Sequence, residues 1–129
     1  MKGHPMKFAI YQIQLTDDQI RTINAKGFDA VPAKKAQLDM TMDFSGNKIG
    51  GLASDAWDRG FYTHVANIEA EDYNEVFEIG NIGPEQNIER LARMHSISVG
   101  DVIVGEDGTL AVVASMGFVA FGFNPKMSA

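Results

Sequence analysis

The stretch that decides the fold is residues 93–117, which read RMHSISVGDVIVGEDGTLAVVASMG. Two apolar runs rich in β-branched residues, 101–105 and 110–115, flank an acidic turn, Glu106-Asp107-Gly108. This pattern predicts a β-hairpin. An aromatic run at residues 118–123 predicts one more strand, so the C-terminal third is expected to form a hairpin or a meander.

Three further strands are predicted upstream of this hairpin. Residues 8–15 are rich in aromatic and β-branched residues, and residues 61–69 have a similar composition. Residues 38–44 alternate strictly, with Leu, Met, Met and Phe on one face and Asp, Thr and Asp on the other. That period of two is typical of a strand with one buried face. Met40 and Met42 are therefore both expected in the core.

Two helices are predicted from their capping residues and apolar stripes. Thr16 and Gln19 have the spacing of a capping box, and Gly27 is a natural stop for the helix that they begin. Ser45 is a candidate N-cap for a second helix, which Gly60 ends. The apolar positions of this second helix share one face, and they are Ile49, Leu52, Ala53, Ala56 and Trp57.

Two shorter helices are predicted farther along the chain. Residues 71–79 carry apolar side chains at helical spacing, among them Tyr73 and Val76. Pro84 suits the first turn of another helix, whose apolar side would contain Ile88 and Leu91.

Strands separated by short helices predict one α+β domain over residues 1–129. The expected sheet is mixed or antiparallel, ends in the C-terminal hairpin or meander, and has partial barrel-like closure as one of its possible forms. Residues 124–129 are expected to fray.

Composition excludes several classes of function. The chain has 17 acidic and 11 basic residues and a net charge of −6, which disfavours direct binding to nucleic acid. It has no cysteine, which excludes disulfides, thiolate metal sites and cysteine nucleophiles. No uninterrupted apolar run is long enough for a membrane span or a signal peptide. A cytoplasmic location is the simplest expectation.

Known chemical motifs are not matched. The glycine-rich residues 45–51 have neither phosphate-loop nor dinucleotide-binding spacing, so a strand-to-helix turn is the preferred interpretation. His4, His64 and His95 form no pair at helical metal-binding spacing. The sequence therefore predicts no cofactor, no metal ligand and no assigned catalytic residue.

One set of polar residues is a candidate binding site. Ser96 and Ser98 lead into the hairpin beside His95 and Asp101, and His64 lies in a predicted strand. A serine, a histidine and an acid are the components of nucleophilic hydrolysis, although the local sequence is not a nucleophile elbow. The alternative is structural: the serines satisfy backbone groups at the entrance to the hairpin.

A resemblance to a known family rests on the order S-x-S-V-G-D-V-I at residues 96–103, followed by Asp-Gly at 107–108 and Gly-Phe at 117–118. With the run YTHVANIE at residues 62–69, this order resembles small phage and plasmid proteins that include YodL-like domains. Arginine is common in those proteins where this chain has Met94-His95. The resemblance implies an origin in mobile elements and supplies no catalytic residue. The phrase S-V-G-D-V-I also occurs in small β-barrels, where the glycine permits a corner and the aspartate caps it.

The leading functional expectation is a non-enzymatic protein that binds another macromolecule, with a protein partner or self-association. An aromatic side chain exposed on the strand at 118–123 would favour such a contact. One alternative is an acidic inhibitor of a host DNA-processing enzyme, which requires Asp39, Asp43, Asp55 and Asp58 to form one continuous stripe. Another is a small hydrolytic or ligand-binding module, which requires His64 to converge with Ser96, Ser98 and Asp101.

Overall fold

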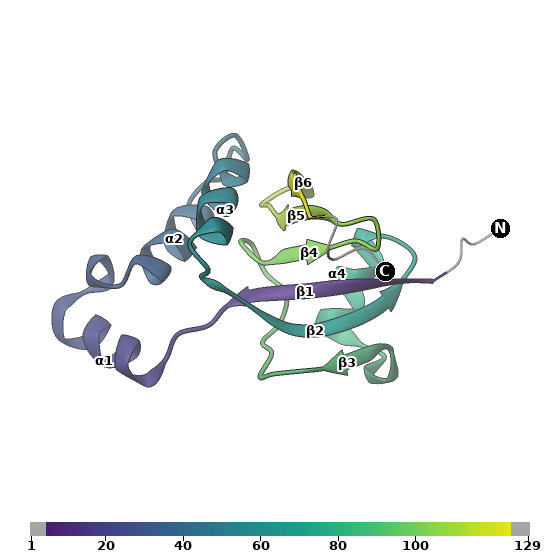
Figure 1. Ribbon diagram of the computed structural model, residues 1–129, viewed down its shortest axis with the longest axis horizontal. Coiled ribbons are helices and arrows are strands. Elements are labelled where there is room, and N and C mark those ends of the chain that lie inside the picture. The colour runs from purple at the N-terminus through teal and green to yellow at the C-terminus, as the bar shows by residue number, and fades with distance from the viewer. Residues whose placement is uncertain (1–4, 125–129) are drawn as a thin grey trace.

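The computed structural model describes residues 5–124, which form an α+β fold around one open sheet (Figure 1). This confirms the predicted fold class. Within the described range, six strands lie in the order β3-β2-β1-β4-β5-β6, and every neighbouring pair is antiparallel. The strands are β1 (Met6–Ile13), β2 (Tyr62–Ala70), β3 (Ile88–Arg90), β4 (Val102–Val104), β5 (Thr109–Val113) and β6 (Phe118–Phe123).

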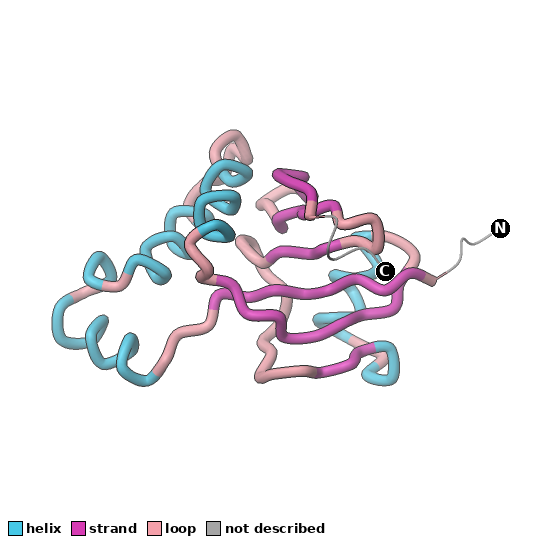
Figure 2. The backbone as a smooth tube through the Cα atoms, viewed as in Figure 1, coloured by secondary structure: helices cyan, strands magenta, loops and turns pink. Residues whose placement is uncertain are grey.

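Helices connect the strands and cover both faces of the sheet, as the backbone trace in Figure 2 shows. The α-helices are α1 (Asp17–Lys26), α2 (Pro32–Thr41), α3 (Ile49–Asp58) and α4 (Tyr73–Ile82). Two short 3₁₀ turns accompany them, Phe28–Ala30 and Glu85–Asn87. Within residues 5–124, no helix has the length and apolar character that a membrane span requires.

The sheet ends at β3 on one side and at β6 on the other, and these two strands do not pair. The barrel-like closure considered from the sequence is therefore not formed. β1 lies near the middle of the sheet, between β2 and β4. Since β1 comes first in the chain and its neighbours come much later, both pairings of this strand join segments that are distant in the sequence.

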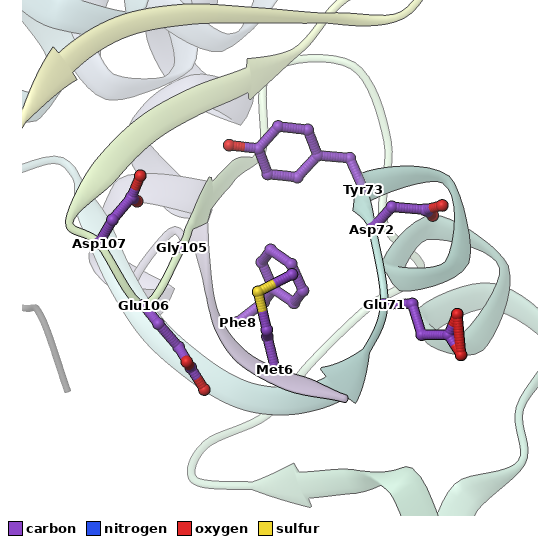
Figure 3. Close-up of a pocket in the computed structure, with 8 residues that line it drawn as sticks. All are labelled: Met6, Phe8, Glu71, Asp72, Tyr73, Gly105, Glu106 and Asp107. Atoms are coloured by element: carbon purple, nitrogen blue, oxygen red, sulfur yellow. The ribbon is translucent and has the colours of Figure 1, made fainter. Parts of the chain in front are cut away.

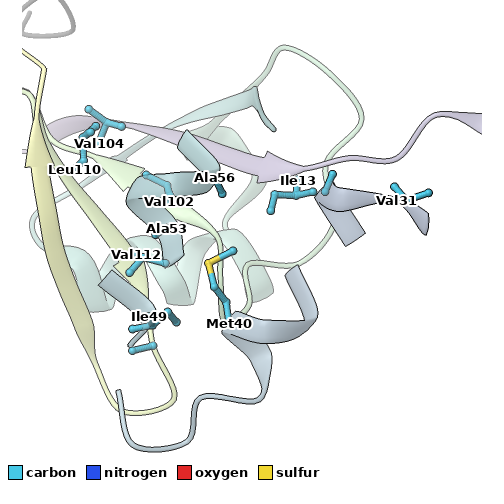
Figure 4. Packing of buried hydrophobic residues seen from close by; sticks show 12 residues of the cluster. Ile13, Val31, Met40, Ile49, Ala53, Ala56, Val102, Val104, Leu110 and Val112 are labelled. Atoms are coloured by element: carbon cyan, nitrogen blue, oxygen red, sulfur yellow. The ribbon is translucent and has the colours of Figure 1, made fainter. Parts of the chain in front are cut away.

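Two apolar cores lie on opposite faces of the sheet, because successive strand side chains point to opposite sides. Helices α2 and α3 cover one core, which Figure 4 shows with Met40 and Ile49 facing Val102 and Val112. Helix α4 covers the other core, to which β1 contributes Phe8 and Ile10.

The predictions for the first strand and the first helix are confirmed. Thr16 caps α1 with its side chain, and Gln19 completes the capping box through both reciprocal hydrogen bonds. The backbone N–H of Gly27 donates to the carbonyl of Ile23 and ends the helix. This part of the fold is local, so the sequence could specify it alone.

The strand predicted at residues 38–44 is wrong, because residues 32–41 form α2. Pro32 occupies the start of the helix, where its missing N–H is not needed. Ala33 and Met40, seven residues apart, share the buried face of α2, whereas Met42 lies beyond the helix and is exposed. The apolar alternation was real, but packing of a helical face against α3 and the sheet decided the conformation.

The helix predicted between Ser45 and Gly60 is confirmed as α3, but Ser45 is not its cap. Asp43 supplies the cap, since its Oδ2 accepts hydrogen bonds from the N–H groups of Lys48 and Ile49 at 2.9 and 2.8 Å. The Ser45 hydroxyl donates to the other oxygen of Asp43. These hydrogen bonds lower the pKa of Asp43, the bond from Ser45 most of all. The chain's own carboxylate thus takes up two of the N–H groups with which the glycine-rich turn could have held an anion.

The helix predicted after Pro84 is also wrong. The chain makes only the 3₁₀ turn Glu85–Asn87 and then enters β3, which pairs with β2 through Ile88 opposite Ile68. A short segment without an N-cap side chain gains more from the free edge of β2 than from one more helical turn. The helix predicted at residues 71–79 is confirmed as α4, and Asp72 caps it through the N–H of Glu75.

The C-terminal strands are confirmed. β4 and β5 form the predicted hairpin around residues 105–108, where the N–H of Gly108 donates to the carbonyl of Gly105 at 3.0 Å. β6 pairs with β5 and completes the meander. Fraying is predicted for residues 124–129; the N–H of Asn124 donates to the carbonyl of Gly108 at 2.8 Å, and residues 125–129 lie outside the described range.

Candidate functional site

The polar residues singled out in the sequence surround a buried hydrogen-bond network. Gln12, which is fully buried on β1, donates from Nε2 to the carbonyl of His95 at 2.8 Å and to Oδ2 of Asp101 at 3.1 Å. Its Oε1 accepts from the N–H of His95 at 3.1 Å. One amide side chain therefore ties the segment before the hairpin to the centre of the sheet. Sequence reasoning missed Gln12, since it looked like one of two equivalent polar residues in an alternating strand.

Asp101 forms the corner at which this segment enters β4. Its Oδ2 accepts a hydrogen bond from the backbone N–H of Ser98 at 2.9 Å, and its own N–H donates to the carbonyl of Ser98 at 3.0 Å. Gly100 adopts a φ of 96°, a conformation that favours glycine. Ser98 thus takes part through its backbone, while its side chain is exposed. This geometry supports an architectural role for the Ser-Val-Gly-Asp corner.

The two histidines lie apart. The exposed side chain of His95 places Nδ1 2.8 Å from the carbonyl oxygen of Ser96. His64 stacks on the Tyr11 ring, with 4.7 Å between the ring centroids, and its Nε2 lies 2.8 Å from Oδ1 of Asn67. Tyr11 packs against the core beneath α2 and α3, whereas the neighbouring Gln12 points to the opposite face.

The structure therefore brings His95, Ser96, Ser98 and Asp101 together along one stretch of chain, where the Asp101 carboxylate accepts from the Ser98 backbone. His64 stacks on Tyr11, on the face of the sheet opposite Gln12. The convergence of side chains that a hydrolytic module requires is not formed. A cavity beside His95 is lined by parts of β1, α1, α2 and residues 93–95, without His64, Ser96, Ser98 or Asp101.

Burial raises the pKa of Asp101 from 3.8 to about 6, although the hydrogen bond from Ser98, the charge of His95 and the hydrogen bond from Gln12 oppose it. The folded protein thus binds more protons than the unfolded chain between these two values. The contribution of Asp101 to stability is therefore present below pH 3.8, falls as the pH rises to about 6, and is constant above.

Asp101→Asn is expected to remove this dependence, because an amide oxygen can accept the same two hydrogen bonds without a charge. The free energy of unfolding of the variant should match that of the parent near pH 4 and exceed it near pH 8 by at most about 3 kcal/mol, the equivalent of two pKa units. Urea titrations across this pH range would measure the difference. A constant difference at all pH values would contradict the raised pKa of Asp101.

The acidic stripe required for a nucleic-acid mimic is not continuous. Asp43 is buried because it caps α3. Asp39 pairs with Lys35, and Asp55 pairs with Arg59, so each of these charges is balanced on its own helix.

The most distinctive exposed feature is the outer edge of β6. Its sequence, FVAFGF, contains no charge and no proline, and all six residues are partly or fully exposed. Phe123 is 63% exposed. Strand order leaves the side of β6 that faces away from β5 without a neighbouring strand in the described part of the chain. Long, uncharged edge strands are templates for pairing with another chain.

The opposite edge strand, β3, differs from β6 in its length and in its charge. β3 has only three residues, and two of them, Glu89 and Arg90, are charged and exposed. Arg90 also pairs with Glu85 in a bidentate contact. Short length and charge are the usual protection of an edge strand, so the contrast identifies β6 as the candidate interaction surface.

A second candidate surface is a cavity at the start of β1, formed by residues from three distant segments. Nothing in the local sequence of any one segment signals it.

No family model, no curated protein and no solved structure matches the chain.

Proposed function

We propose that this chain is a non-enzymatic binding protein that acts by pairing the edge of β6 with an extended strand of another protein chain, with a second copy of itself as the simplest partner. The observation that carries the proposal is a six-residue, uncharged edge strand opposite an edge that is short and charged. Backbone hydrogen bonds would supply affinity, and the exposed side chain of Phe123 would supply apolar contact area.

Self-pairing suits this strand for a geometric reason. Two copies of an antiparallel edge can meet across a two-fold axis, which extends the sheet through both molecules and covers both edges at once. Each molecule carries a net charge of −6, so the contact needs a surface without charge, and β6 provides one. The resemblance to phage and plasmid proteins supports a cytoplasmic binding role of mobile-element type.

The test is the oligomeric state of the protein and of Ala120→Lys. Ala120 is an exposed residue in β6, and a lysine there protects an edge strand without disturbing either core. We expect sedimentation velocity to show a dimer for the parent protein and a monomer for the variant. Since the edge is uncharged, the dimer should persist at high salt.

Ala25→Lys is the matched control, because it introduces the same change at an exposed position of α1, far from β6 in Figure 1. It should leave the dimer intact. A parent protein that stays monomeric at high concentration, or an Ala120→Lys variant that still dimerises, would overturn the proposal.

A further inference from the structure

A cavity of about 450 Å³ lies where the start of β1 meets two connections, the one between β2 and α4 and the one between β4 and β5 (Figure 3). Its size is within the range of small-molecule binding sites. No residue that lines the cavity belongs to β6 or to the Gln12–Asp101 network, although the Tyr73 ring lies 5.3 Å from the ring of Phe118 in β6. An inference drawn from the cavity lining does not depend on the proposed function.

The floor of the cavity is apolar. Met6 and Phe8 form it, and Tyr73 faces them from the start of α4 (Figure 3). The Phe8 and Tyr73 rings are in contact, with 5.7 Å between their centroids. Gly105 leaves space on one side of the cavity because it has no side chain. A Cβ at this position would lie 3.0 Å from Oδ1 of Asp107 and 4.0 Å from Cε1 of Phe8.

The rim of the cavity is acidic on two sides. Glu71 and Asp72 lie on one side of Phe8 and Met6 in Figure 3, and Glu106 and Asp107 lie on the other. Within residues 5–124, no lysine, arginine or histidine lines this cavity, and none of the four carboxylates forms an ion pair. The rim therefore carries four carboxyl groups beside an aromatic floor, and none of them has an ion-pair partner among residues 5–124.

Hydrogen bonds hold Asp107 and Glu106 in position. Asp107 accepts from the N–H and the hydroxyl of Thr109, and these bonds lower its pKa. Oε2 of Glu106 accepts from the backbone N–H of Lys7 at 2.8 Å. Burial, followed by the charge of Asp107, raises the pKa of Tyr73, so its phenol stays neutral and presents an uncharged ring.

We propose that this cavity binds an aliphatic polyamine. A methylene chain matches the apolar floor, and ammonium groups at its two ends match the acidic pairs on the two sides. Aromatic faces attract cations as well as alkyl groups, which strengthens the fit. A bare metal ion suits the site less well, because no group of three metal-ligating side chains is present among the described residues.

The experiment is calorimetric titration of the full chain at low ionic strength with spermidine, 1,4-diaminobutane, n-butylamine and Mg²⁺. Spermidine is expected to bind most tightly, and n-butylamine, which has one charge, about tenfold or more weakly than the diamine. Backbone amide NMR shifts caused by spermidine should centre on Tyr73, Gly105 and Asp107. Equal affinity for the diamine and for either n-butylamine or Mg²⁺ would overturn the proposal.

A charge-matched pair of variants separates the cavity from the net charge of the protein. Glu71→Gln with Glu106→Gln removes one carboxylate from each side, and the new amide oxygen at 106 can still accept from Lys7. Glu78→Gln with Glu89→Gln removes two exposed charges that do not line the cavity. The first pair should weaken spermidine binding by about tenfold or more, while the second pair should bind as the parent does. Equal weakening in both pairs would refute the site.

Discussion

Met40→Ala is expected to lower the free energy of unfolding by about 2–5 kcal/mol, the usual cost of truncating a fully buried methionine. Met40 has no exposed surface. Its side chain packs between α2 and the corner at Gly100. If Gly100 carried a Cβ, that atom would lie 3.6 Å from both Cβ and Cε of Met40. The Tyr62 hydroxyl lies 3.5 Å from its sulfur. The truncated side chain would leave a cavity between α2 and the sheet.

Met42→Ala is the matched control, since Met42 lies just beyond α2 and is 64% exposed. It should change stability by less than about 0.5 kcal/mol. Urea unfolding followed by circular dichroism measures both variants. If residues 38–44 formed a strand, the two methionines would share one face and the two variants would behave alike. Similar losses in both would therefore contradict the helix.

Gln12→Leu is expected to lower the free energy of unfolding by about 4 kcal/mol. Leucine fills a similar volume but leaves the N–H and carbonyl of His95 and the carboxylate of Asp101 without the partners that Gln12 supplies. Each buried polar group without a partner costs about 1–3 kcal/mol, reduced here because His95 is partly accessible to water. Hydrogen exchange of residues 95–98 should also accelerate, because Gln12 holds this segment to the sheet.

Gln14→Leu is the matched control, because Gln14 follows Gln12 by two residues and lies just beyond the end of β1. Its side-chain amide donates to the carbonyl of Arg93, but this bond lies at the surface, where water can replace it. The expected change is within about 0.5 kcal/mol. If Gln12→Leu were as mild as Gln14→Leu, the Gln12 network would not hold the segment before the hairpin in place.

Much of the fold follows from local sequence signals. The capping box at Thr16, the stop at Gly27 and the acidic turn between β4 and β5 all act within a few residues, and the structure shows each of them. The segments at 38–44 and 84–91 were predicted incorrectly for one shared reason. Each is a short apolar pattern compatible with two conformations, and contacts from elsewhere in the chain selected between them.

The candidate sites also differ in how much of each could be predicted from local sequence. The apolar, uncharged run of β6 is visible in the sequence, which already suggested an aromatic contact strand. Whether that run is an edge depends on strand order, which no single segment encodes. The partners of Asp101 and the acidic cavity depend on pairings across more than 80 residues, such as Gln12 with His95 and Lys7 with Glu106.

By itself, the sequence determined the α+β class, the C-terminal hairpin and the capped ends of α1, because turn and capping chemistry act between neighbours. Only the tertiary structure decided that residues 32–41 are helical, that His64 and Asp101 lie on opposite faces, and that β6 is an open edge. The physical reason is that burial and strand pairing join residues distant in the chain, and their free energy outweighs local preference wherever that preference is weak.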